Sequence, residues 1–274
     1  MATLPNALPK LVSDPTGGTL GLALPPGKLI DTTDDGPWPE PLLWHAERAA
    51  ATGDWAGVEP ARRTAGLLPL LIDVGGGQGG PEGWELMPDE VSYPGDHDPE
   101  DVLAEYWEEC AADEAEGGEE GAGAEWPGLA AVPVSGTARN PNADELAAEI
   151  ADFIVTDGSW LKEPRLALVP ARRSADIPAA VGWSGPLNHE NDVARLCAVL
   201  RSWEDRFGIR VVALTFDQLI VSVAAPPTTR EEAEAVAVEH FAFCPDNIHQ
   251  SSEPGLGAYA EHLIDQEIWS FWWD

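Results

Sequence analysis

Cysteine, methionine, tyrosine and basic residues are all scarce in this sequence. Its 274 residues include 3 cysteines, 2 methionines, 3 tyrosines and 15 lysines and arginines together. Three cysteines cannot form the dense disulfide framework of a small secreted protein, and such a sparse, odd set is typical of a reducing compartment. The cysteine content therefore predicts a cytoplasmic protein.

Long hydrophobic runs are also missing. No stretch approaches the roughly 18–20 consecutive apolar residues that a membrane-spanning helix requires. The N-terminal sequence MATLPNALPKLVSDP contains Pro5 and Pro9 and has no apolar segment of signal-peptide length. We therefore expect neither contact with a membrane nor a signal peptide.

The shortage of basic residues has the strongest consequence for function. There are 48 acidic residues against 15 basic ones, which gives a net charge of -33. This charge repels phosphate groups, so we expect no direct binding to a nucleic-acid backbone. A basic protein or a metal ion is a possible partner, whereas the simplest alternative is that the acidity serves solubility alone.

Local patterns in the first half of the chain predict both strands and helices. A continuous apolar run at 66–74 is typical of a strand buried on both faces, and alternating leucines at 20–24 indicate a shorter strand. We expect helices at 41–51 and 98–116, the second with Asp98 as its N-cap.

The second half carries stronger helix signals. Helices are expected at 142–155, 190–207, 230–243 and 257–266, and strands at 165–170, 209–215 and 219–224. Asn188 is the predicted cap of the 190–207 helix and Gly208 its end. Thr229 and Glu232 have the spacing of a capping box. The short connection between the last two strands predicts an antiparallel hairpin.

These elements predict an α/β (or α+β) fold with a mixed sheet flanked by helices. We expect an N-terminal module at 1–113, an acidic, Gly-rich linker at 114–139 and a C-terminal module at 140–274. The two modules could share one sheet. The part around 114–125 is expected to be exposed and mobile, because low-complexity acidic sequence cannot bury enough apolar surface to fold.

Five motifs in the last third of the chain carry a resemblance to a known family. They are GW-G--N at 182–188, AVLRSWEDRFG at 198–208, PP-T-EEA at 226–233, EHFAFCPDNIHQ at 239–250 and W-FWWD at 269–274. Together they resemble the bacterial, largely actinobacterial family called domain of unknown function 4253, over roughly residues 165–274. The resemblance implies a small α/β cytoplasmic protein without an agreed activity. Some relatives are encoded near toxin–immunity loci, which implies an immunity-like role.

One motif contains residues that could carry chemistry. His240 and Cys244 lie four apart on a predicted helix and so share a face. With Asp246 and His249 they could bind zinc, and His240, Cys244 and His249 are the candidate metal ligands. His240 and Cys244 could also act as base and nucleophile, although the C-terminal end of a helix does not activate a thiolate. The third interpretation is packing in the core, and we expect neither a cofactor nor a catalytic residue.

The terminal sequence WSFWWD predicts a strand with Trp269, Phe271 and Trp273 on one face and Trp272 on the other. A buried terminal strand explains this pattern, whereas an exposed aromatic patch would bind a partner. The predicted ligand- or partner-binding residues are Trp183, Asn188, Asp246, Gln250 and Trp272.

Two functions therefore remain open. The first is a non-enzymatic binding or regulatory protein, immunity-like, whose acidic surface and aromatic C-terminal site contact a basic protein. The alternative is a hydrolase-like enzyme or metal-binding protein that uses the cluster of His240, Cys244, Asp246 and His249.

Overall fold

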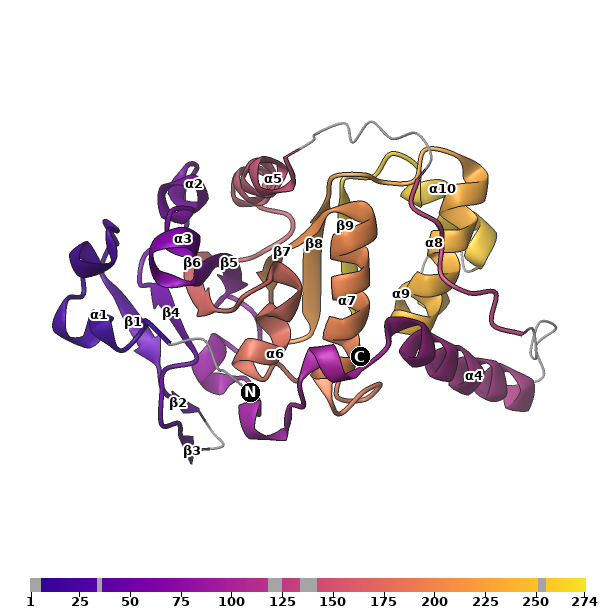
Figure 1. Cartoon of the computed structure of the whole chain (residues 1–274), viewed down its shortest axis with the longest axis horizontal. Helices are drawn as coiled ribbons and strands as arrows, with labels where there is room; N and C mark the ends of the chain where they lie inside the picture. The colour runs from indigo at the N-terminus through magenta and orange to yellow at the C-terminus, as the bar shows by residue number, and fades with distance from the viewer. Residues whose placement is uncertain (1–5, 34–35, 118–124, 134–141, 251–254) are drawn as a thin grey trace.

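The computed structural model of the protein describes residues 6–33, 36–117, 125–133, 142–250 and 255–274 (Figure 1). Its central element is a mixed β-sheet of 7 strands in the order β1-β4-β6-β5-β7-β8-β9. Helices flank this sheet, so the predicted α/β class is confirmed. The described part also contains a separate pair of short strands, β2 (Thr32–Thr33) and β3 (Gly36–Pro37).

Neighbouring strands of the sheet are antiparallel except β5 and β7, which run parallel. The strands are β1 (Gly27–Ile30), β4 (Leu43–Ala46), β5 (Leu67–Asp73), β6 (Pro164–Pro170), β7 (Ile209–Leu214), β8 (Gln218–Val223) and β9 (Ile268–Trp272). The expected hairpin is the antiparallel pair β7 and β8.

The two halves of the sequence contribute alternately to this sheet. β6 lies between β4 and β5, and β5 lies between β6 and β7. The modules at 1–113 and 140–274 are therefore divisions of the sequence whose strands interleave in one shared sheet.

The helices differ greatly in length. They are α1 (Lys10–Ser13), α2 (Asp54–Val58), α3 (Ala61–Ala65), α4 (Pro99–Gly117), α5 (Ala143–Asp157), α6 (Ile177–Val181), α7 (Val193–Phe207), α8 (Arg230–Phe243), α9 (Asp246–His249) and α10 (Leu256–Leu263). The predicted capping box is present at the start of α8, where Thr229 accepts from the Glu232 N–H and Glu232 binds back. Gly208 ends α7 in the left-handed conformation at φ 64°, which glycine adopts without steric cost.

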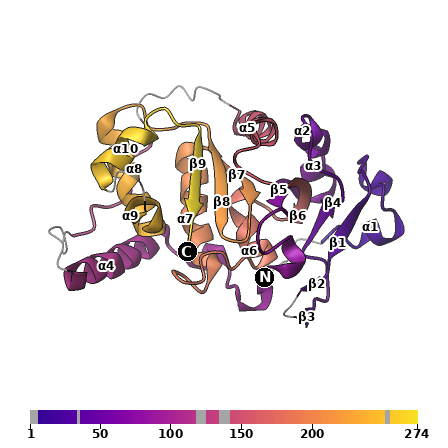
Figure 2. The same ribbon diagram turned by 180° about the vertical axis from the view of Figure 1, so that it is seen from behind.

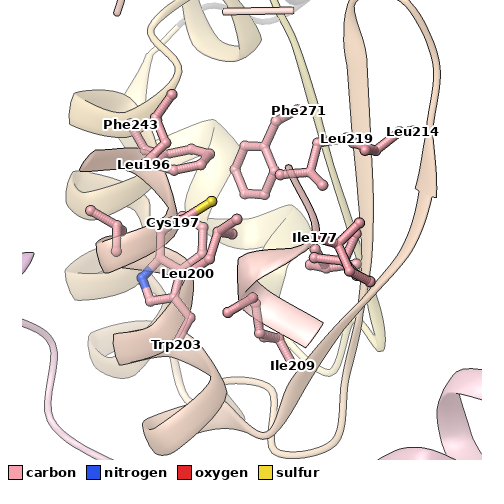
Figure 3. Close-up of a cluster of buried hydrophobic side chains, with 14 of the residues drawn as sticks. Ile177, Leu196, Cys197, Leu200, Trp203, Ile209, Leu214, Leu219, Phe243 and Phe271 are labelled. Atoms are coloured by element: carbon pink, nitrogen blue, oxygen red, sulfur yellow. The ribbon is translucent and has the colours of Figure 1, made fainter. Parts of the chain in front are cut away.

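The main core lies between α7 and the strands that it covers. The apolar stripe of α7 includes Leu196, Cys197, Leu200 and Trp203, which point towards side chains of the sheet in Figure 3. Trp203 stacks on Phe271 of β9 with ring centroids 5.4 Å apart. On the other face, α5 packs on β7 and β8 in a second cluster with buried side chains from all three elements. Strands buried on both faces explain the continuous apolar runs in the sequence.

Three local predictions were wrong. Leu43–Ala46 is a strand rather than part of a helix, because all four residues are buried between β1 and β6. The alternating leucines at 20–24 do not form a strand, since Gly18–Leu20 is a short 3₁₀ turn. Asn188 does not cap α7, because Asp192 accepts the Ala194 N–H there.

Part of the predicted linker contacts the core. Residues 118–124 and 134–141 lie outside the described residues, whereas residues 125–133 have no regular secondary structure. Trp126 and Leu129 pack on the main core, and Ala130 donates its N–H to Glu239 at 2.5 Å. This segment thus fastens the middle of the chain to α8.

Candidate functional site

The C-terminal strand β9 is one of the two edge strands of the sheet and the place where the sequence-predicted site residues gather. Trp269, Phe271 and Trp273 are 2%, 0% and 2% exposed, and they face the core. Trp272 is half-buried on the other side, and its Nε1–H donates to Asp217 at 3.3 Å. The alternation predicted for the aromatic tail is confirmed.

The backbone of β9 presents hydrogen-bonding groups on two sides. The Glu267 carbonyl accepts from Val223, and the Trp273 N–H donates to Asp217, so the odd-numbered residues face β8. In an antiparallel strand the backbone groups of alternate residues point to opposite sides. The N–H and C=O groups of Ile268, Ser270 and Trp272 therefore point to the outer edge.

Side chains from the motif CPDN occupy much of this outer edge. The Asn247 amide donates to the Ser270 carbonyl at 2.6 Å and accepts the Trp272 N–H at 3.1 Å. The Cys244 thiol donates to the Trp272 carbonyl at 3.0 Å. We call Cys244, Asp246 and Asn247 the edge cluster. Because an unpaired edge strand is a template for aggregation, this cluster gives CPDN a structural role.

The last residue of the chain is held from two sides. Asp246 accepts the Asp274 N–H at 3.3 Å, and the Asn188 amide donates to the Asp274 carbonyl. Gln250 is exposed and donates to the other Asp246 oxygen at 3.2 Å. Thus Asn188, Asp246 and Gln250 meet at the C-terminal end of β9.

Trp183 and Trp272 lie at the same end but differ in accessibility. Trp183 is 2% exposed, donates its Nε1–H to the Thr215 carbonyl at 2.9 Å and packs edge-on against Trp273. Its ring therefore supports the site from inside. Of the two indoles, the half-buried Trp272 is the one with surface to offer a partner.

His240 is completely buried and neutral. Its Nδ1 lies 3.0 Å from the Tyr259 hydroxyl, and its ring lies among Trp203, Trp269 and Phe271. Burial, with a smaller contribution from the Arg206 charge, lowers the pKa of His240 to about 3. A base with this pKa is too weak to accept protons near neutral pH.

Cys244 is also buried, and burial raises the pKa of its thiol to about 12. Reactive cysteines have a lowered pKa, so this site has the opposite electrostatics. His249 packs edge-on against Phe241 at 5.2 Å. Within the described ranges, no group of three or more His, Cys, Asp and Glu residues has an arrangement that could hold a metal ion. The geometry thus supports the packing interpretation of His240 and Cys244.

The roles of two important residues were not predicted from the sequence. Asn247 belongs to the quoted motif, but only the position of β9 shows what its amide binds. Glu239 is 0% exposed and forms two 2.7 Å hydrogen bonds to Arg206 and one of 2.6 Å to the Trp203 indole. A glutamate preceding His240 on an apolar helix face was the available signal, but its partners lie on a helix far away in the sequence.

These features define an α/β protein with a mixed sheet, whose C-terminal edge strand is covered by side chains of the preceding helices. Residues 165–274 match the family model described as Domain of unknown function (DUF4253), which confirms the resemblance of the C-terminal part. No curated protein and no solved structure matches the chain. In the described residues, no helix has the length and apolar character needed to cross a membrane.

Proposed function

We propose that this protein is a non-enzymatic cytoplasmic binding or regulatory protein, immunity-like, that contacts a basic protein through an acidic surface beside the C-terminal end of β9. The observation that carries the proposal is the charge balance. With 48 acidic and 15 basic residues, the carboxylates exceed the cations by 33. A surface of this kind attracts and steers a cationic partner.

Many of the cations are already paired within the chain. The pairs include Arg48–Asp54, Arg62–Asp144, Arg173–Asp205, Arg195–Glu190, Arg201–Asp176, Arg206–Glu239 and Arg210–Asp144. Because these arginines are engaged with the protein's own carboxylates, few positive charges remain to compensate the acidic surface. The excess negative charge is therefore available to a partner.

Helix α4 brings acidic side chains close to the C-terminal site. Cys110 of α4 shares a buried cluster with Phe241 of α8 and Ile248 of α9, and α4 lies beside α9 in Figure 1. Glu108 and Glu109 on α4 are exposed. The partner-facing surface in this proposal thus combines α4 with Trp272, Asp246 and Gln250.

The test is to immobilise the protein with both of its ends free of tags and to capture its binding partners from a lysate of the encoding organism. The salt concentration is varied between about 0.01 and 1 M, over which the Debye length falls from roughly 30 Å to 3 Å. We expect a basic protein that binds at low salt and is released at high salt, and direct titration of that protein must reproduce the salt dependence. Absence of any cationic partner at low salt would contradict the proposal.

A matched pair of variants locates the surface. Glu108→Lys/Glu109→Lys reverses two charges on α4, and Glu145→Lys/Glu149→Lys reverses two exposed charges on α5. The net charge changes equally in both. We expect the charge reversal on α4 to lower the affinity for the captured partner by about tenfold or more. The charge reversal on α5 should lower this affinity less. The reverse order would place the surface elsewhere.

A further inference from the structure

The outer edge of β9 has two neighbouring positions for an amide group, and Asn247 fills one of them. Its side-chain amide lies between the Ser270 carbonyl and the Trp272 N–H. A strand residue added in parallel would make the same two bonds through its own N–H and C=O. Asn247 thus takes the place of one residue of an additional strand.

The next position along β9 lies between the Ile268 carbonyl and the Ser270 N–H. Both groups point outward by the alternation established from Glu267 and Trp273. Among the described residues, neither group has a hydrogen-bond partner. An unpaired donor and acceptor at strand spacing is the feature that an extended peptide recognises.

A cavity of about 430 Å³ opens at this position. Its walls come from α9 and α10, through Asn247, Tyr259, His262 and Leu263, and its floor includes Ile268 and Ser270. Figures 1 and 2 both place α9 and α10 beyond the outer side of β9. The volume lies within the range of roughly 300–1,000 Å³ that is typical of ligand pockets.

We propose that this cavity binds a short, extended segment of a basic partner protein, which adds one residue to the edge of β9. That residue donates its N–H to the Ile268 carbonyl and accepts the Ser270 N–H, as the Asn247 amide does one position further on. The inference rests on the proposed function, because it assigns a binding mode to the same basic partner.

The surroundings limit the length and the charge of the segment. Asn247 closes the edge on one side, so the segment pairs with β9 through a single residue rather than as a long strand. Glu267 adjoins the lining residue Ile268 in the sequence, and the whole chain carries a net charge of -33. These charges favour a cationic segment. They disfavour a second copy of the chain, because two copies would repel each other.

The test uses Ser270→Pro, which removes the N–H that the partner needs. Proline is tolerated on an edge strand where its nitrogen faces away from the neighbouring strand, as that of Ser270 does. Ser270→Ala keeps the N–H and is the matched control. Thermal unfolding of both variants checks that the fold is retained.

The probe is the acetylated, amidated peptide Lys-Val-Lys-Val-Lys, compared with the same peptide carrying N-methyl groups on its backbone. We expect binding to the wild type and to Ser270→Ala. We expect affinity about tenfold lower for Ser270→Pro and for the N-methylated peptide, since each loses backbone hydrogen bonds. The partner captured from the lysate should lose affinity for Ser270→Pro in the same way.

The outcomes separate this inference from the proposed function. Equal binding of both peptides to all three proteins would overturn strand addition and leave charge-driven binding intact. A captured partner that binds Ser270→Pro as well as the wild type would also overturn it. Failure of every cationic ligand to bind would contradict both. Sedimentation that shows a wild-type dimer and a Ser270→Pro monomer would assign the edge to a second copy and overturn the inference.

Discussion

His240 shows how burial controls the chemistry of single residues at this site. The ring has centroid distances of 4.9 Å to Trp203, 4.5 Å to Trp269 and 4.9 Å to Phe271, so aromatic groups replace the water that would stabilise its charged form. Spacing in the sequence predicted a helix face shared with Cys244, but α8 ends at Phe243 and Cys244 has a non-helical backbone with φ -154°. The spacing also could not show that water is excluded around His240. The sequence pattern was therefore equally compatible with metal binding and with packing in the core.

The low pKa of His240 predicts a pH-dependent stability. The pKa is about 3 in the folded protein and 6.5 as its model-compound value, so the unfolded state binds a proton more readily. The contribution of His240 to stability is fully present above pH 6.5 and is lost as the pH falls towards 3. The free energy of unfolding should fall by about 1.4 kcal/mol per pH unit at most from this residue.

The measurement is urea unfolding of the wild type and His240→Phe between about pH 5 and 7, where carboxylates with ordinary pKa values stay ionised. The difference between the two proteins isolates His240 from His45 and His189, whose pKa values are also lowered by burial. The free energy of unfolding of the wild type relative to that of His240→Phe should decrease as the pH falls. If the free energies of unfolding of the two proteins changed with pH in parallel, burial would not lower the pKa of His240 in the folded protein.

At the scale of helices and strands, the sequence reveals features that depend on neighbouring residues but not features that depend on contacts between distant segments. The start of α8 was predictable, because the capping box depends on residues three apart. The strand Leu43–Ala46 was not, because its four residues are strand-like only through burial between β1 and β6. The same distinction applies to the candidate site. The motif CPDN was visible, but the bonds of Asn247 to β9 join residues more than twenty positions apart.

The capping box gives the prediction at this scale. Thr229→Ala removes the hydroxyl that accepts the Glu232 N–H. The free energy of unfolding should fall by about 1 kcal/mol, within the range of roughly 0.5–2 kcal/mol measured for such caps. Chemical denaturation of this variant and of Thr229→Ser, which keeps the hydroxyl, makes the comparison. A loss of the same size in Thr229→Ser would mean that the methyl group, rather than the cap, is responsible.

For the molecule as a whole, the interleaved sheet decides what can fold alone. β6 belongs to the matched segment 165–274, except for its first residue, yet both of its neighbours, β4 and β5, come from the first half of the chain. β5 also separates β6 from β7. The core that covers these strands contains residues from both halves. The chain should therefore unfold as one cooperative unit.

A fragment of residues 165–274 tests this conclusion. It lacks β5, so β6 has no strand to pair with and the buried side of β7 becomes an open edge. We expect the isolated fragment to aggregate or to lack a cooperative transition, whereas the full chain shows a single transition. Circular dichroism during heating and size-exclusion chromatography make the comparison. A monomeric fragment that melts cooperatively would show that the C-terminal strands form a stable sheet without β5.

The position of β5 also bears on how such a chain could arise by recombination of genes. A DNA segment that encodes only residues 165–274 carries the helices and strands around the C-terminal site, but it does not carry the strand that joins β6 to them. Insertion of that segment into an unrelated gene would yield a folded product only where the recipient supplies a strand between β6 and β7. We therefore expect the unit that can be inherited as a working fold to be larger than the segment that the family model matches.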